Sequence, residues 1–375
     1  MNQPEIKQIT LPPLNITIHA DQKVSLEWLH QQPLPVNNQP PLPKLSDHWQ
    51  QWIAVNKLLE FPDHVLVEKM VEKGIDVKLA LEAVNQASNH PYLQAGKQFV
   101  QLLQKVESML TIQSQLASLS EASPSIDRKP WVSRSEFLES YYSQNTPLIL
   151  TDILTNWRAL ELWTPEYLKQ NYGQAMVEIQ AGREADPDYE INLQRHQKTV
   201  RFADYIDWVV SGKQTNDYYM VANNKNLDRP EFKGLLNDLE IFTEYLDPTQ
   251  ISGCIFFWYG PAGTVTPLHH DPVNLLLAQV SGRKFIRMIP PYQVPFLYNH
   301  IGVFSEVDLE NPDYRKYPLF QKVRPIEFIL EPGEVIFIPV GWWHHVRSLE
   351  PSISVSMTNF VFPNTYEWKY PQVKR

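Results

Sequence analysis

Cysteine and long apolar runs are nearly absent from this chain. Cys254 is the only cysteine among 375 residues, so no internal disulfide and no site built from several thiolates can form. No apolar run approaches the ~20 residues that a membrane-spanning helix needs. Residues 1–21 also lack the charged and then apolar regions of a secretory signal. The sequence therefore predicts a cytoplasmic protein with no membrane partner.

Basic residues are outnumbered by acidic ones. The chain has 33 lysines and arginines against 42 aspartates and glutamates, a formal net charge of −9. Nucleic-acid binding usually needs a basic face, so this balance argues against a nucleic-acid partner and mildly favours a neutral or basic substrate. Hydrophobic residues make up 43% of the chain, which is typical of a globular protein.

Composition divides the chain into four stretches. Residues 1–44 are rich in proline, which interrupts helices, and predict an extended surface segment. Residues 45–120 carry apolar residues at helical spacing and predict a helical module. Residues 121–130 are polar and read as a linker, which leaves residues 131–375 for the main domain.

One long helix is predicted over residues 92–119 of the helical module. Phe99, Leu103, Val106 and Leu110 follow a four-three-four spacing that suits a packing seam. The pattern fades after Leu110, so a sustained coiled coil is not expected. The seam packs either within the chain or against a second copy, which would make the protein a homodimer.

Short apolar runs separated by turn residues fill the main domain. Ser133 and Glu136 form a capping-box pattern that opens a short helix carrying Phe137 and Tyr141. Many short strands at this spacing indicate a mainly β sandwich or barrel. We expect strands near residues 146–152, 175–181, 217–222, 253–259, 264–270, 274–280, 284–289, 326–330, 334–339, 344–348 and 352–362.

A metal-binding pattern lies in the strand that ends in His269-His270-Asp271. Side chains at i and i+2 of a strand share a face, so His269 and Asp271 can converge on one point while His270 points away. The run Gly341-Trp342-Trp343-His344-His345 offers a third ligand. Two histidines and one carboxylate leave open positions on a metal, as in non-haem iron(II) oxygenases. An H-x-D pair alone is usually coincidence, so the prediction of a metal site depends on the motifs that accompany it.

The stretch from Trp258-Tyr259-Gly260-Pro261 through Asn359 resembles the JmjC-type hydroxylases. These enzymes have a double-stranded β-helix, also called a jelly-roll or cupin fold, and the closest likeness is to protein arginyl and asparaginyl hydroxylases. The resemblance covers roughly residues 129–363 and makes residues 131–375 a JmjC/cupin-like catalytic domain. It implies His269, Asp271 and His344 as catalytic iron(II) ligands, with 2-oxoglutarate and O₂ as the other reactants.

The resemblance also implies residues that bind 2-oxoglutarate. Lys284 would pair with its distal carboxylate, and Lys284 shares a strand face with apolar Ile286 and Met288, which is uncommon for a solvated lysine. The other reading is a surface lysine whose stem covers apolar area. Further contacts would come from Thr266, from Tyr219 with Tyr218 as its alternative, and from Asn359, which we expect on one strand face with Ile353, Val355, Met357 and Val361.

The resemblance implies a 2-oxoglutarate-dependent dioxygenase that hydroxylates an amino-acid side chain of a protein or peptide and releases succinate and CO₂. The sequence departs from the family pattern at Leu275, because relatives usually carry asparagine four residues after the metal aspartate. This departure leaves the substrate preference open. The alternatives are a metal-binding cupin without oxygenase activity, an inactive binding scaffold and an RNA-base hydroxylase. Demethylation would require an N-methyl group at the reacting position.

Overall fold

The computed structural model describes residues 45–119, 125–221, 225–299 and 302–368, together with the backbone of three strands near the N-terminus. Contacts divide the chain into two units, Met1–Leu102 and Leu103–Arg375, which are described separately. The three strands form an antiparallel sheet of β1 (Lys7–Leu11), β2 (Leu14–Ile18) and β3 (Val24–Trp28). The expected extended segment at 1–44 thus contains a small sheet, and its remaining residues lie outside the described ones.

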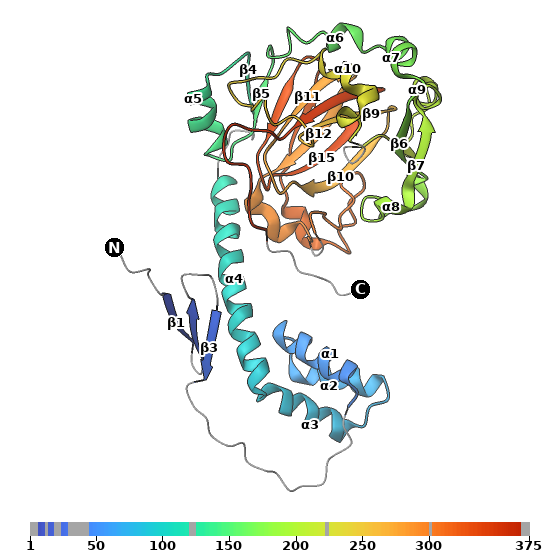
Figure 1. Cartoon of the computed structure of the whole chain (residues 1–375). Helices are drawn as coiled ribbons and strands as arrows, with labels where there is room; N and C mark the ends of the chain where they lie inside the picture. The colour runs from blue at the N-terminus through green and yellow to red at the C-terminus, as the bar shows by residue number, and fades with distance from the viewer. Residues whose placement is uncertain are drawn as a thin grey trace, which may run out of the picture. The chain divides into compact units, whose positions relative to one another are not determined.

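The predicted helical module is present as four helices (Figure 1). Residues Ile53, Leu66, Met70, Ala80 and Val84 form its buried core. The side chain of Asp76 caps α3 by accepting from the backbone N–H groups of residues 78 and 79. Among the helices in the described part of the chain, none is long and apolar enough to cross a membrane. The helices are α1 (Asp47–Leu58), α2 (Asp63–Glu72), α3 (Val77–Ser88) and the long α4 (Pro91–Ala117).

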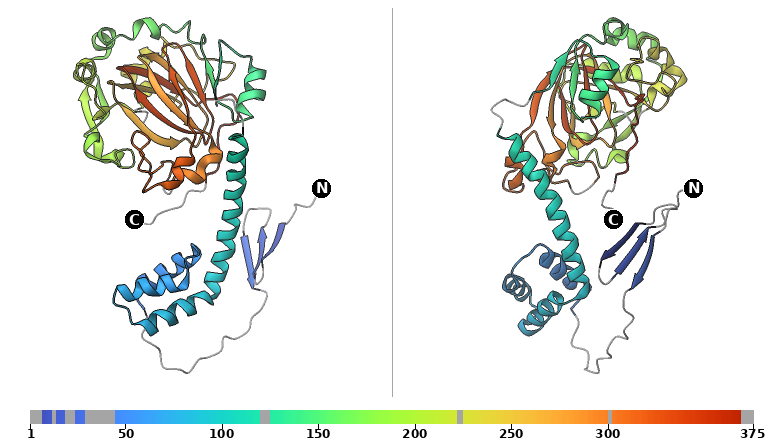
Figure 2. Two further views of the ribbon diagram at one scale, coloured as in Figure 1. Left: turned by 180° about the vertical axis from the view of Figure 1, so that it is seen from behind. Right: turned by 90° about the vertical axis from the view of Figure 1, so that its left-hand side faces the viewer.

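Two facing sheets make up the centre of the second unit (Figures 1 and 2). Apolar residues from both sheets, including Leu277, Ile286 and Val346, pack between them. The fold is therefore a double-stranded β-helix, and the fold prediction is confirmed. The six-stranded sheet has the order β4 (Asp127–Lys129), β5 (Leu148–Leu150), β14 (Val335–Ile338), β11 (Leu275–Ser281), β16 (Ser352–Met357) and β9 (Ile255–Gly260). The four-stranded sheet has the order β10 (Val265–His270), β15 (Trp343–Ser348), β12 (Lys284–Ile289) and β13 (Ile326–Leu330).

A third, smaller sheet continues the edge of the six-stranded sheet. It consists of β7 (Gln197–Arg201), β6 (Met176–Ala181) and β8 (Tyr218–Tyr219) in that order. A β-bridge between Met220 and Tyr259 joins it to β9. This sheet brings Tyr219 beside the central barrel, and β7 is a strand that the sequence analysis did not predict.

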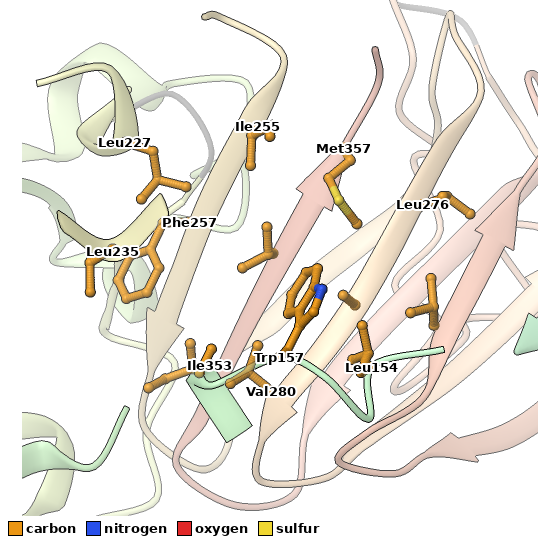
Figure 3. Close-up of a cluster of buried hydrophobic side chains, with 14 of the residues drawn as sticks. Leu154, Trp157, Leu227, Leu235, Ile255, Phe257, Leu276, Val280, Ile353 and Met357 are labelled. Atoms are coloured by element: carbon orange, nitrogen blue, oxygen red, sulfur yellow. The ribbon is translucent and has the colours of Figure 1, made fainter. Parts of the chain in front are cut away.

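Helices cover the outer face of the six-stranded sheet and enclose the largest hydrophobic core. Figure 3 shows how Trp157 and Phe257 pack with Leu276, Ile353 and Met357 in this core. Ser133 accepts from the Glu136 N–H at the start of α5, as the capping box predicts, and Phe137 and Tyr141 are buried. These helices are α5 (Arg134–Glu136), which continues as the π-helix Phe137–Tyr142, then α6 (Ala159–Leu162), α7 (Pro165–Tyr172), α9 (Phe202–Val210) and α10 (Lys233–Leu236). The short helix α8 (Leu193–His196) instead lies beside β6.

Each of the eleven expected strands overlaps an observed strand, but three expectations need correction. The helices α7 and α9 occupy stretches for which only strands and turns were expected. The expected linker at 121–130 ends in β4, which pairs with β5 in the six-stranded sheet. The last expected strand, 352–362, ends as β16 at Met357, and this affects the position of Asn359.

Candidate active site

A cavity of about 400 Å³ lies between the two sheets. His269, Asp271 and His344 line one part of it, and their ligand atoms lie within 4.8 Å of one another. His269 lies opposite His344 in the register of β10 and β15. The Nε2 atom of His344 is 3.4 Å from Oδ2 of Asp271. The structure thus brings together all three residues that the sequence predicted as metal ligands.

Backbone carbonyls orient both imidazole rings of this cluster. The Nδ1 atom of His269 lies 2.8 Å from the carbonyl oxygen of Pro267, and Nδ1 of His344 lies 3.1 Å from that of Trp342. Because a carbonyl oxygen can only accept, Nδ1 must carry the proton in each ring. Each Nε2 therefore presents its lone pair, as a metal-binding histidine requires.

Burial shapes the protonation of the cluster. It lowers the pKa of His344 well below its usual value, with the neighbouring His269 acting in the same direction, so the ring is neutral and can act as a ligand. Burial raises the pKa of Asp271, because a low dielectric disfavours the carboxylate. A divalent cation bound by these three side chains would supply the opposing charge that keeps Asp271 ionised, so the residues fit such an ion.

Thr266 also lines the cavity, although regular strand parity would place it on the opposite face from His269. The register of β10 against β15 shifts between these two residues: Thr266 pairs with Val346, whereas His269 pairs with His344. Three steps on β10 therefore oppose two on β15, which defines a β-bulge. Pro267 lies within the bulge, where its missing N–H breaks no regular ladder. The bulge turns Thr266 and His269 toward the same cavity.

Lys284 and Tyr219 lie at the other end of the cavity. The Nζ atom of Lys284 donates to the Tyr219 hydroxyl at 3.2 Å, and both side chains are buried. In the described part of the chain no carboxylate forms an ion pair with this lysine, and burial lowers its pKa to about 7. A buried ammonium without a counter-charge is costly, so this end of the cavity is suited to an anionic group such as the distal carboxylate of 2-oxoglutarate.

Asn359 does not line this cavity, and its assignment to 2-oxoglutarate is corrected. Its side chain donates to the carbonyl oxygen of Asp247 at 2.8 Å. The strand β16 ends two residues earlier, and its Ile353, Val355 and Met357 face the outer core rather than the cavity. The row of β16 that faces inward consists of serines, and Ser356 lines the cavity with Thr358.

The histidines beside the ligands point away from the cavity, as strand parity predicts. The ring of His270 packs against Trp343 and Trp368. His345 lies on the outer side of β15, where its Nε2 is 3.3 Å from Oε1 of Glu310. Leu275 lines the cavity, whereas the neighbouring Asn274 bonds to Val340 and Tyr366 elsewhere.

The insertion between β12 and β13, residues 290–325, supplies a wall that the sequence did not reveal. Its Phe304 lines the cavity, forms a β-bridge with His269 and places its ring 5.8 Å from the imidazole. Glu310 anchors the insertion to the barrel through ion pairs with Arg287 and Arg347. No spacing rule could identify Phe304, because it lies in an irregular loop.

Two other cavity residues escaped the sequence analysis. The indole N–H of Trp258 donates to the Ser356 hydroxyl at 2.9 Å, and both side chains line the cavity. Alternation of serine with apolar residues along Ser352-Ile353-Ser354-Val355-Ser356 was the available signal for Ser356, since residues that alternate along a strand share one face.

Comparison with known proteins identifies the family. The model of the cupin-like domain matches residues 134–365. The chain is 33% identical over 236 residues to lysine-specific demethylase 8 of Xenopus tropicalis, covering 60% of this chain and 50% of that protein. It is 32% identical over 241 residues to lysine-specific demethylase JMJ30 of Arabidopsis thaliana, covering 62% and 54%. It is 31% identical over 246 residues to human tRNA wybutosine-synthesizing protein 5, covering 62% and 76%.

The chain spans about half the length of the demethylase relatives. The match nevertheless contains both sheets of the barrel from β5 to β16, all three metal-ligand candidates and Lys284. Family model, fold and side-chain cluster agree, and the resemblance seen in the sequence is confirmed: this chain belongs to the cupin-like, JmjC-type family.

Proposed function

We propose that the protein is an iron(II)- and 2-oxoglutarate-dependent oxygenase that hydroxylates an amino-acid side chain of a protein or peptide. One observation carries this proposal. A His-Asp-His cluster and a buried, uncompensated lysine line the same cavity. Two imidazoles and one carboxylate suit iron(II) and leave coordination positions open, while the lysine suits a dicarboxylate whose other end reaches the metal.

The residues of the chain would divide the work between the two ends of the cavity. His269, Asp271 and His344 would hold iron(II), which when bound activates O₂ as 2-oxoglutarate is oxidised to succinate and CO₂. Lys284 would pair with the distal carboxylate, with the Tyr219 hydroxyl beside it and Thr266 on the adjoining strand. Met288, which pairs with His344, lies four residues along β12 from Lys284, so the two ends are about 13 Å apart between backbone positions.

The apolar walls of the cavity would limit the access of water to the reacting position once a substrate is bound. Leu275, Leu277, Ile338 and Val346 line the cavity together with Phe304. Low water content strengthens the attraction between Lys284 and a carboxylate. It also protects an oxidising centre from side reactions. The substrate side chain would enter past these walls and present a C–H bond to the metal.

The family resemblance supports a polypeptide substrate, and three relatives are named lysine-specific demethylases. A second candidate is hydroxylation of an RNA base, favoured by the relatives named tRNA wybutosine-synthesizing protein 5. The net charge of −9 weighs against RNA. The cytoplasmic location also stays a prediction.

Anaerobic titration of metal-free protein with iron(II) and 2-oxoglutarate tests the proposal. We expect the visible metal-to-ligand charge-transfer band in the wild type and its loss in Asp271→Ala and Lys284→Met. Asp207→Ala and Arg283→Met serve as matched controls, because these side chains are largely exposed and pair with surface charges. A folded, iron-loaded wild type without the band would refute the oxygenase and favour a cupin without oxygenase activity or a binding scaffold.

A further inference from the structure

Arg183 is a buried arginine next to the cavity to which no role has yet been given. It follows β6 at the start of a one-turn helix, Arg183–Ala185, and its side chain is 0% exposed. Its Nη2 donates to Oε1 of Glu190 at 2.8 Å and to the carbonyl oxygen of Val265 at 2.8 Å. Its Nε and Nη1 have no hydrogen-bond partner among the described residues. A buried arginine with unsatisfied donors needs an explanation.

The contacts of Arg183 lead to the residues that surround the 2-oxoglutarate end of the cavity. Its guanidinium lies 5.4 Å from the centre of the Tyr219 ring, and the hydroxyl of this tyrosine accepts the hydrogen bond from Lys284. The carbonyl that it binds belongs to Val265, the residue before Thr266. Its ion-pair partner Glu190 lines the cavity. A single side chain thus contacts Tyr219, the strand that carries Thr266, and the cavity wall.

A second aromatic ring fixes the plane of the guanidinium. Arg183 lies 4.2 Å from the centre of the Tyr189 ring, and the Tyr189 hydroxyl donates to the same Val265 carbonyl at 3.1 Å. Stacked and hydrogen-bonded, the planar guanidinium has little rotational freedom. It can therefore hold Tyr219 in one orientation, which lysine could not reproduce at this site.

Charge also favours a functional role. Arg183 and Lys284 are two buried basic side chains that lie 5.4 Å and 5.9 Å from the centre of the Tyr219 ring, and Glu190 is the carboxylate that pairs with Arg183. Packing alone would not require this arrangement, because well-packed hydrophobic residues commonly replace a buried ion pair without loss of stability. Glu190 balances Arg183, so Lys284 is the basic group without a carboxylate partner among the described residues, and an anionic ligand in the cavity would keep it protonated.

We propose that Arg183 is a positioning residue for 2-oxoglutarate: it orients Tyr219 and the strand of Thr266, and so sets the affinity for the distal carboxylate of the cosubstrate. This inference rests on the proposed function. It adds to the cosubstrate site a residue that does not contact the ligand itself but acts through Tyr219 and the strand of Thr266.

The test compares two ligands in the full-length, manganese(II)-loaded protein by isothermal titration calorimetry. One ligand is 2-oxoglutarate, and the other is 2-oxobutanoate, which keeps the metal-binding 2-oxo acid group but lacks the distal carboxylate. Arg183→Met removes the charge and the hydrogen bonds while keeping much of the volume, and Arg183→Lys keeps the charge without the planar group. Arg201→Met is the matched control, because Arg201 lies at the end of β7 in the small sheet that Arg183 follows and is about half exposed.

For Arg183→Met we expect an affinity for 2-oxoglutarate about tenfold lower, because this substitution removes both the cation–π interaction with Tyr219 and the hydrogen bond to the strand of Thr266. The affinities for manganese(II) and 2-oxobutanoate should stay unchanged. Arg183→Lys should show an intermediate loss, which keeps the test valid if the methionine variant does not fold. Arg201→Met should match the wild type.

An unchanged affinity for 2-oxoglutarate in Arg183→Met would overturn the inference. An equal loss of affinity for both ligands and for manganese(II) would also overturn it, because it would show a general structural role. A wild type that does not bind 2-oxoglutarate would instead overturn the proposed function itself.

Discussion

Replacing Lys284 by methionine is expected to stabilise the metal-free protein and to abolish its binding of 2-oxoglutarate. Lys284 is 2% exposed, and its pKa falls from 10.5 to about 7 because burial disfavours the ammonium. At about 1.4 kcal/mol for each pKa unit, this difference corresponds to a destabilisation of at most about 5 kcal/mol from burying the charge. Methionine has a similar volume and carries no charge, so the variant avoids this cost.

The stability gain should depend on pH in a defined direction. Between pH 7 and pH 10.5 the lysine of the folded protein is neutral, whereas that of the unfolded chain still binds a proton. Because the unfolded state binds more protons, the free energy of unfolding of the wild type rises with pH in this window. The advantage of Lys284→Met is therefore greatest near pH 7 and declines toward pH 10.5.

Guanidinium denaturation of both metal-free proteins at pH 7 and pH 9.5, followed by near-ultraviolet circular dichroism, measures this advantage. Calorimetric titration with 2-oxoglutarate in the presence of manganese(II) measures the loss of binding. Lys284 is not buried as an uncompensated charge if the variant is less stable than the wild type at pH 7. The same conclusion follows if the variant exceeds the wild type in free energy of unfolding by the same amount at both pH values. A variant that still binds 2-oxoglutarate tightly would show that Lys284 does not hold the cosubstrate.

Two further predictions concern other parts of the chain. Gly282→Ala should lower the free energy of unfolding by about 3 kcal/mol or more in urea denaturation, because Gly282 has φ +69° and an added Cβ would lie 2.2 Å from the carbonyl oxygen of Pro351. The control Gly253→Ala, with φ +72° and open space around it, should lower it by only about 1 kcal/mol. Equal losses of stability in the two variants would contradict the predicted clash at Gly282. The side chains of Phe99, Leu103 and Val106, three residues of the predicted seam on α4, are 47–68% exposed and predict a homodimer. Leu103→Glu with Val106→Glu should therefore yield monomers in sedimentation equilibrium, while Gln101→Glu with Ser108→Glu should not; a monomeric wild type would refute this use of the seam.

The sequence predicted most of the barrel because its strands are short, alternating and separated by clear turns. His269 and Asp271 were predicted from their two-residue spacing at the end of β10, and the resemblance to JmjC-type hydroxylases singled out His344, which lies opposite His269 on β15. Where parity held, as for His270, His345 and Lys284, side-chain directions were also correct.

Parity failed where the backbone departed from a regular strand. Thr266 shares the cavity with His269 only because of the bulge in β10. Asn359 was misplaced because β16 ends at Met357 and because its apolar row faces outward. Arg183 and Phe304 carry no periodic signal: Arg183 begins a one-turn helix and Phe304 lies in a loop, and contacts far along the chain position both.

The way in which the 290–325 insertion is attached bears on how such an enzyme can change over evolutionary time. The insertion supplies Phe304 to the cavity, yet its ion pairs run from Glu310 to Arg287 and Arg347 on the outer side of the barrel. Changes to the side chains of this loop can therefore reshape one wall of the cavity, whereas a displaced loop backbone would disturb β10, because Phe304 forms a β-bridge with His269. Loops tolerate such variation better than the sheets that support them. Variation in the specificity of the cavity could thus arise from side-chain changes along one loop, while the strands that carry the candidate metal ligands stay unchanged.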